Sequence, residues 1–257
     1  MSADFSCQVA VITGGAGGIG GALGAALKAA GAQVLLADLH GSDDVVACDV
    51  ADPAAVEALA DLAWQRFGRV DLLVNNAGIS GGGGRLWKAD LAAARQVFEV
   101  NFWGVWHGCA AFAPRMAAQE HPSAIFNVAS ENALFCAVPR AAAYIASKHA
   151  VLGLTESLRE DLPPHVHAGT IIPGWVLSGL TSEGGRDVAM PAERYAEIIL
   201  PQIAARERFV VSHAYNVVPM GERTEALEAA FARSAPRYDG DIEYDVRAYI
   251  ARLRSEG

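Results

Sequence analysis

The chain has 257 residues, which suits one α/β domain or two small ones. Its 29 acidic residues outnumber its 20 basic residues and give a formal charge of −9, so nucleic acid and anionic membranes are not expected partners. No apolar run reaches the roughly 18 residues of a transmembrane helix, and residues 1–6 lack the features of a signal peptide.

Short apolar segments alternate with helical patterns over residues 1–213. The expected strands are 9–12, 34–37, 45–48, 70–74, 124–128, 167–172 and 209–212. The expected helices are 22–30, 53–67, one long helix over 89–112, 142–162 and 191–206. This alternation predicts an α/β fold: a single doubly wound Rossmann-type domain with a seven-stranded, mostly parallel sheet.

The C-terminal segment, residues 214–257, is more charged than the rest of the chain and contains two helix-like stretches, 222–232 and 242–253. We expect a helical appendage that packs on the same domain, residues 1–213.

The cysteines and histidines give no sign of a metal site or a disulfide framework. Cys7, Cys48, Cys109 and Cys136 are scattered without a CxxC pair, and the histidines show no ligand spacing. This pattern is typical of reduced thiols in a cytosolic protein, so we expect a cytoplasmic location and no catalytic metal.

A glycine-rich turn, TGGAGGIG from Thr13 to Gly20, lies between the first expected strand and the first helix. Glycine there permits a tight turn and a close approach of the backbone to a diphosphate at the helix N-terminus. Asp38 ends the second strand about 20 residues further on, where a carboxylate can accept hydrogen bonds from the adenosine ribose. Because that carboxylate repels a 2′-phosphate, and neither Leu39 nor the turn offers a cation, the sequence favours NAD over NADP.

Further motifs follow in order along the chain: Cys48-Asp49-Val50, Asn75-Asn76-Ala77-Gly78 and Pro173-Gly174, together with Asn101, Ser130, Tyr144 and Lys148. With the glycine turn they resemble the short-chain dehydrogenase/reductase family, in its short single-domain subtype, over residues 5–213. The resemblance implies a catalytic tetrad of Asn101, Ser130, Tyr144 and Lys148. The NAD(H) contacts that we expect from the motifs and their neighbours are Gly14, Gly17, Gly18, Ile19, Gly20, Asp38, Asp49, Val50, Asn76, Ala77, Gly78, Tyr144, Lys148, Pro173, Gly174 and Val176.

Tyr144 and Lys148 are four residues apart on an expected helix, hence on one face. A nearby ammonium favours the phenolate, so we expect Lys148 to lower the pKa of Tyr144 toward the range useful for acid–base catalysis. By resemblance, Lys148 also binds the nicotinamide ribose, Ser130 holds the substrate oxygen, and Asn101 holds a water that links Lys148 to solvent.

The chain departs from the family pattern at two places. Only ten residues separate Asp38 from Asp49, so the helix that usually joins the second and third strands is missing, and a tight irregular loop is expected. Ser130 and Tyr144 are one residue further apart than in most members, so we expect a bulge in the loop 131–140 beside the substrate.

The substrate region is expected to be apolar, because Trp175, Val176, Leu177 and Leu180 follow the Pro173-Gly174 turn. Leu134, Phe135, Trp87 and Trp103 are candidates for aromatic or apolar walls. The Ser130-Glu131-Asn132 loop and the C-terminus faintly resemble bacterial aromatic (benzylic) alcohol dehydrogenases.

The predicted function is therefore NAD-dependent interconversion of a secondary alcohol and a ketone on a bulky apolar small molecule, aromatic or alicyclic. A hydroxysteroid or terpenoid alcohol is an alternative substrate. A catalytically silent NAD-binding regulator on the same fold is an alternative function. The resemblance also implies a homodimer or homotetramer that pairs the helices 89–112 and 142–162.

Overall fold

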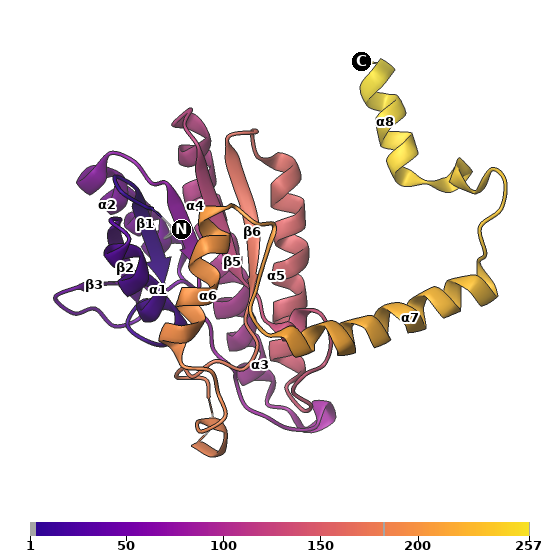
Figure 1. Cartoon of the computed structure of the whole chain (residues 1–257), viewed down its shortest axis with the longest axis horizontal. Helices are drawn as coiled ribbons and strands as arrows, with labels where there is room; N and C mark the ends of the chain where they lie inside the picture. Colours follow the sequence, from indigo (N-terminus) through magenta and orange to yellow (C-terminus); the bar gives the residue numbers. More distant parts are fainter. Residues whose placement is uncertain (1–3, 182, 257) are drawn as a thin grey trace. The chain divides into compact units, whose positions relative to one another are not determined.

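The computed structural model describes residues 4–181 and 183–256 of the chain. The chain divides into a large unit, residues 1–214, and a small C-terminal unit, residues 215–257. In the large unit, strands and helices alternate, as Figure 1 shows.

The large unit is built on a seven-stranded sheet in which every pairing is parallel. Its strands are β1 (Val9–Thr13), β2 (Gln33–Asp38), β3 (Val45–Ala47), β4 (Leu72–Asn75), β5 (Ser123–Val128), β6 (Val166–Ile172) and β7 (Phe209–Val211). Their order is β3-β2-β1-β4-β5-β6-β7, which confirms the predicted doubly wound fold. The strand order reverses between β1 and β4: β2 and β3 are added on one side of β1, and β4 to β7 on the other. In sheets of this kind, ligands bind beyond the carboxyl ends of the strands at this point.

Six helices belong to this unit: α1 (Gly18–Ala29), α2 (Pro53–Phe67), α3 (Leu91–Phe98), α4 (Gly104–Ala118), α5 (Ala142–Asp161) and α6 (Ala192–Ala204). Residues of α2, α4 and α5 pack in one buried cluster, and residues of α1 and α6 pack in another. The two clusters lie on opposite faces of the sheet, since Val9 and Val11 of β1 belong to the first and Ala10 and Ile12 to the second. The apolar run of β1 is thus explained by burial on both faces.

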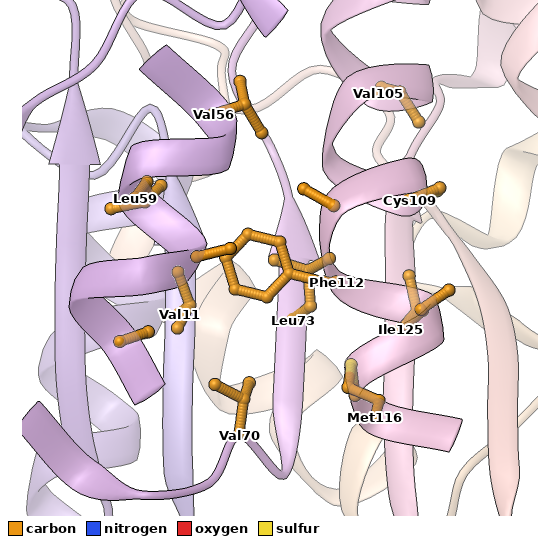
Figure 2. Packing of buried hydrophobic residues seen from close by; sticks show 14 of the residues in the cluster. Val11, Val56, Leu59, Val70, Leu73, Val105, Cys109, Phe112, Met116 and Ile125 are labelled. Carbon is orange, nitrogen blue, oxygen red and sulfur yellow. The ribbon is translucent and has the colours of Figure 1, made fainter. Parts of the chain in front are cut away.

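Phe112 of α4 is the largest side chain at the centre of the first cluster. Figure 2 shows its ring among Val11, Leu59, Val70 and Leu73. The ring is fully buried and stands 5.8 Å from the ring of Trp64 on α2, centre to centre. These contacts hold α2 and α4 against β1 and β4.

Local signals in the sequence explain why α2 begins and ends where it does. The side chain of Asp52 accepts a hydrogen bond from the backbone N–H of Ala54 at 2.9 Å, and Pro53 occupies the first helical position, where its missing N–H costs nothing. Gly68 closes the helix at φ 73°, in the left-handed region that glycine favours.

The prediction of one long helix over residues 89–112 is wrong. The structure has α3, then a π-helical turn at Glu99–Trp103, and then α4, which runs on to Ala118. Asp90 caps α3 by accepting the N–H of Ala92 at 2.9 Å. A π turn adds a residue to the helix and rotates the side chains that follow it. Asn101 lies in this turn.

The connection between β2 and β3 contains no helix, as the spacing of Asp38 and Asp49 predicts. Residues 39–44 form a short loop, closed by a bridge between Ser42 and Val45. The N–H of Cys48 then donates to the carbonyl of Asp38 at 2.7 Å. The parallel partner strand is reached through a loop alone.

Short 3-10 turns complete the large unit; those in the described residues are Leu86–Lys88, Glu131–Ala133, Glu183–Gly185 and, at its boundary, Ala214–Asn216. The C-terminal unit contains α7 (Val217–Ser234), a 3-10 turn (Asp241–Tyr244) and α8 (Val246–Glu256). Both helices start and end at residues other than those expected from the sequence. Within residues 4–181 and 183–256, no helix combines the length and the apolarity that membrane crossing requires.

Candidate active site

A cavity of about 780 Å³ opens at the carboxyl ends of β1, β4, β5 and β6. Its size suits a cofactor and a small ligand. Of the residues predicted from the sequence, those that line it are Gly14, Gly17, Gly18, Ile19, Asp38, Asp49, Val50, Asn76, Ala77, Gly78, Ser130, Tyr144, Lys148, Pro173, Gly174 and Val176. Gly20 and Asn101 are the two that do not.

The glycine turn needs glycine for different reasons at different positions. Gly14 and Gly18 have φ values of 65° and 52°, in the left-handed region. A Cβ at Gly20 would lie 2.2 Å from the carbonyl oxygen of Gly14, so this glycine permits close packing within the turn. A Cβ at Gly17 would meet no atom within 4 Å, and this position borders the cavity.

Side chains from β1 and β4 hold the floor of the cavity together. The hydroxyl oxygen of Thr13 accepts the backbone N–H groups of Asn76 at 3.0 Å and Ala77 at 3.1 Å. The side-chain amide of Asn76 donates to the carbonyls of Thr13 at 2.9 Å and Gly14 at 3.0 Å. Asn76 therefore fixes the glycine turn through its side chain.

Asp38 stands at the end of β2 with both carboxylate oxygens engaged. One oxygen accepts the N–H of Ala16 at 2.9 Å, and the other accepts the N–H of Leu39 at 2.8 Å. The carboxylate is thus held at the rim of the cavity as a fixed acceptor. Nearby, burial raises the pKa of the Cys48 thiol to about 11, with Asp49 and Asp52 adding to the effect, so this cysteine stays protonated at neutral pH.

Tyr144 and Lys148 meet Ser130 at the other end of the cavity. The Lys148 ammonium lies 5.8 Å from the centre of the Tyr144 ring and donates to the carbonyl of Val128 at 2.8 Å. Burial lowers the pKa of Lys148 to about 8.

The expected direction of the Tyr144 pKa is wrong for the chain alone. Burial raises the pKa of the phenol above its usual value, because the phenolate is the charged form and loses its hydration. A hydrogen bond from Ser130 lowers this pKa, and the charge of Glu131 raises it further. The loss of hydration therefore has a larger effect on the pKa of Tyr144 than the positive charge of Lys148, which the sequence places four residues away.

Asn101 forms hydrogen bonds to residues next to the catalytic end of the cavity. Its side-chain oxygen accepts the N–H of Ile79 at 2.8 Å, and its amide donates to the carbonyl of Ile79 at 2.9 Å and to the hydroxyl of Ser147 at 3.1 Å. A Cβ on Gly78 would lie 3.3 Å from the Asn101 oxygen and 3.6 Å from the Lys148 nitrogen. The π turn thus brings Asn101 next to Lys148 and against the loop that follows β4.

Apolar and glycine residues surround the space in front of Tyr144. The lining here includes Gly81, Gly82, Gly83, Val138 and Leu180. The glycine run was visible in the sequence but was not interpreted as part of the site. A Cβ at Gly82 would meet no atom within 4 Å, whereas a Cβ at Gly81 would approach Val97 to 2.4 Å.

Trp175 also lines the cavity, and its indole lies against Gly185, where a Cβ would approach the ring to 2.5 Å. Leu134 and Phe135 do not line the cavity, nor do Trp87 and Trp103, which are 75% and 40% exposed. Those four candidates for walls of the pocket were wrong. Within the part of the chain that the structure describes, no cluster of three His, Cys, Asp or Glu side chains could hold a metal ion.

The family model for short chain dehydrogenases matches residues 8–189. The chain belongs to this family. One related short chain dehydrogenase is 1-deoxy-11-beta-hydroxypentalenate dehydrogenase of Streptomyces arenae, which is 36% identical over 80% of this chain and 83% of its own length. The family and this relative indicate that the protein is an oxidoreductase.

Two solved short chain dehydrogenases carry different cofactors. A protein from Burkholderia phymatum, solved with NAD, is 31% identical, with a TM-score of 0.80 over 91% of this chain and 99% of its own. A protein from Burkholderia cenocepacia, solved with NADP, is 28% identical, with a TM-score of 0.74 over 91% of this chain and 100% of its own. The family therefore indicates a nicotinamide cofactor without deciding between NAD and NADP.

Proposed function

We propose that the protein is an NAD-dependent dehydrogenase that interconverts a secondary alcohol and a ketone on a bulky, apolar small molecule. The observation that carries this proposal is the meeting of Ser130, Tyr144 and Lys148 at one end of a cavity that has Asp38 at the other. The cradle of Gly14, Gly17 and Gly18 fits a dinucleotide, because the turn is tight and Gly17 has open space in front of it.

In the oxidative direction, Tyr144 takes the proton of the substrate hydroxyl, and Ser130 donates a hydrogen bond to the substrate oxygen. NAD, when bound, would supply the acceptor for the hydride that leaves the carbinol carbon. Lys148 contributes a positive charge beside the phenolate and fits the ribose of the nicotinamide half. In the reductive direction, Tyr144 returns the proton to the carbonyl oxygen.

The preference for NAD rests on Asp38. Its carboxylate is fixed by the N–H groups of Ala16 and Leu39, so it cannot turn away from an incoming 2′-phosphate without losing both hydrogen bonds. We expect Asp38→Asn to narrow the ratio of kcat/KM for NAD over NADP by at least about tenfold, as an electrostatic penalty of about 1.4 kcal/mol predicts. An unchanged ratio would remove Asp38 from this role.

A neutral, bulky alcohol fits the substrate end of the cavity. Val138, Ala141, Trp175 and Leu180 supply apolar surface, and Lys148 is the one cation among the described lining residues. The name of the Streptomyces relative describes a hydroxylated acid as its substrate, which supports alcohol oxidation. Because Lys148 is buried beside Tyr144, an acid group would find no free cation in this lining, so we place aromatic or alicyclic alcohols, including terpenoid and steroid alcohols, ahead of acids.

The test is a panel of secondary alcohols and ketones offered with NAD and with NADP, followed through NADH absorbance. We expect turnover with bulky aromatic or alicyclic members, and loss of turnover with retained NADH binding in Tyr144→Phe. A protein that binds NADH but turns over no member of the panel would favour the alternative, a catalytically silent NAD-binding regulator. Retained turnover in Tyr144→Phe would reject Tyr144 as the acid/base.

A homodimer or homotetramer is also proposed. Phe102, Trp103 and Trp106 form an aromatic cluster whose rings lie 5.0 to 6.1 Å apart, and the two tryptophans are exposed at the start of α4. Such a patch is typical of a protein–protein contact. Light scattering at micromolar concentration should give the mass of an oligomer, and Trp106→Glu should lower it; a monomeric mass would refute the proposal. A cytoplasmic location stays a prediction.

A further inference from the structure

Asn132 connects the catalytic serine to the wall of the substrate pocket. Ser130 precedes the 3-10 turn Glu131–Ala133, and its hydroxyl oxygen accepts the backbone N–H of Asn132 at 3.2 Å. The side-chain amide of Asn132 also donates to this oxygen, at 3.4 Å. Both residues are buried, with exposed fractions of 5% and 3%.

The other end of the Asn132 side chain fixes its orientation. Its carbonyl oxygen accepts the backbone N–H groups of Ala137 and Val138, each at 3.1 Å. Because backbone N–H groups only donate, the atom that they meet must be the oxygen, and the amide nitrogen must then face Ser130. Val138 itself lines the cavity.

A serine hydroxyl has one proton to donate and two lone pairs to accept with. Asn132 supplies two donors to the Ser130 oxygen, so the hydroxyl proton of Ser130 has no acceptor on Asn132's side. Ser130 and Tyr144 line the same cavity, and a hydrogen bond from the Ser130 hydroxyl lowers the pKa of the phenol. With the Ser130 proton directed toward Tyr144, donation runs from Asn132 through Ser130 to Tyr144.

We propose that Asn132 is a positioning residue of the dehydrogenase: it fixes Ser130 as a hydrogen-bond donor while holding Val138 in the pocket wall. The one Ser130 proton points to Tyr144 before substrate binds and to the substrate oxygen in the reacting complex. The inference rests on the proposed function, because it assigns Asn132 a part in the same reaction. Asn132 acts through Ser130 and touches no reacting atom.

Two charged groups face Tyr144 from the elements packed around it. Lys148 lies on the same helix, α5, and Glu131 lies in the 3-10 turn, next to Asn132. Asp38 and Asp49, the other charged residues in the cavity lining, are at the adenosine end. A neutral replacement of Asn132 leaves all these charges in place, so any change in the ionisation of Tyr144 must come through the hydrogen bonds of Ser130.

The experiment compares two replacements of Asn132 that remove different contacts. Asn132→Asp keeps a side-chain acceptor for the N–H groups of Ala137 and Val138 but loses the side-chain donor to Ser130. Asn132→Leu loses the side-chain contacts at both ends. The backbone N–H of residue 132 keeps its hydrogen bond to Ser130 in both variants. We expect both variants to lower kcat by about tenfold or more, the loss of one oriented hydrogen bond in the reacting complex. Of the two Asn132 variants, only Asn132→Leu should also raise KM for bulky substrates, because only it releases Val138 from its place in the pocket wall. The control variant Val138→Ala should raise this KM as well.

A readout of ionisation separates positioning from simple loss of structure. With NAD bound, an ultraviolet difference titration against Tyr144→Phe reports the Tyr144 phenolate directly. We expect the titration midpoint of Tyr144 to move to higher pH in Asn132→Leu and to stay in place in Val138→Ala. An unmoved midpoint in Asn132→Leu, with circular dichroism and NADH affinity like the wild type, would overturn the proposal.

A double-mutant cycle with Ser130→Ala completes the test. If Asn132 acts through Ser130, Asn132→Asp should cost little further kcat in the Ser130→Ala background. Independent, multiplicative losses would overturn the proposal. If the wild type turns over no alcohol of the panel, the proposed function fails, but the titration still shows whether Asn132 orients Ser130. If Asn132→Leu does not fold, the double-mutant cycle with Asn132→Asp tests the proposal instead.

Discussion

Gly17 offers a substitution that should weaken cofactor binding without weakening the fold. In Gly17→Ala, the added methyl meets no protein atom within 4 Å, and the backbone is extended at φ −174°, which any residue adopts. The loss of chain entropy on folding becomes smaller, so stability should be unchanged or higher by about 0.4–1 kcal/mol. The same methyl projects from the turn at the start of α1 that the diphosphate must approach.

The magnitude follows from the contact that the methyl displaces. One charge-assisted hydrogen bond between a backbone N–H and the diphosphate contributes about 1.5–3 kcal/mol. Its loss raises the Kd for NADH by roughly tenfold to 150-fold. Fluorescence titration with NADH measures the Kd, and thermal unfolding without cofactor measures the stability.

Gly20→Ala is the matched control. Its Cβ would stand 2.2 Å from the carbonyl of Gly14, so this variant should lose stability as well as affinity. An unchanged Kd in Gly17→Ala would refute the placement of the diphosphate at this turn, and a loss of stability in Gly17→Ala would refute the reasoning from open space.

The remaining predictions concern the buried interior and the C-terminal segment. Lys148→Met should stabilise the protein by up to roughly 3 kcal/mol at pH 7, since burial lowers the pKa of Lys148 from 10.5 to about 8 and each unit is worth about 1.36 kcal/mol. The Lys148 amine binds its proton more tightly in the unfolded chain than in the folded one, so the wild type gains stability relative to the variant as the pH rises from 8 to 10.5. Urea unfolding should therefore show a smaller difference in stability between the two proteins at pH 10 than at pH 7. A constant difference would contradict this prediction. Phe112→Ala should cost about 3–5 kcal/mol in urea unfolding, because the ring fills the centre of its cluster; a cost below about 1 kcal/mol would mean that the cluster collapses around the gap. Glu131→Gln should move the titration of Tyr144 to lower pH, because the carboxylate of Glu131 raises the pKa of Tyr144. If residues 214–257 pack on the large unit, as expected from the sequence, limited trypsin digestion should release them slowly, and rapid release would contradict the packing.

The sequence was most informative where signals are local. The strand, glycine turn and helix at residues 9–29 follow each other directly, and Asp38 lies at the next strand end, so this half of the cavity could be predicted. The catalytic residues could be predicted only by family resemblance, because Ser130 and Tyr144 come from different elements. The π turn at Glu99–Trp103 was missed because the apolar pattern over residues 89–112 stays helical through it.

Two features of the site depend on contacts that no spacing reveals. The proximity of Lys148 to Tyr144 follows from a four-residue interval, but the burial that raises the pKa of Tyr144 depends on the whole surrounding fold. Asn132 stands next to Glu131 in the sequence and belongs to none of the motifs that assign a catalytic or cofactor role. Its bonds to Ala137 and Val138 arise from the path of the loop 131–140, in which Arg140 adopts φ 69°.

The short loop between β2 and β3 bears on how the cofactor leaves. In most members a helix would flank the adenosine end, whereas here residues 39–44 span it and the side chain of Leu39 is 57% exposed. A nicotinamide dinucleotide that acts as a co-substrate must depart once in every catalytic cycle, and this departure sets the turnover rate of many enzymes. If the cofactor binds as proposed, less protein has to be displaced around its adenine, so we expect its release to meet a lower barrier and the hydride step to have more influence on the overall rate.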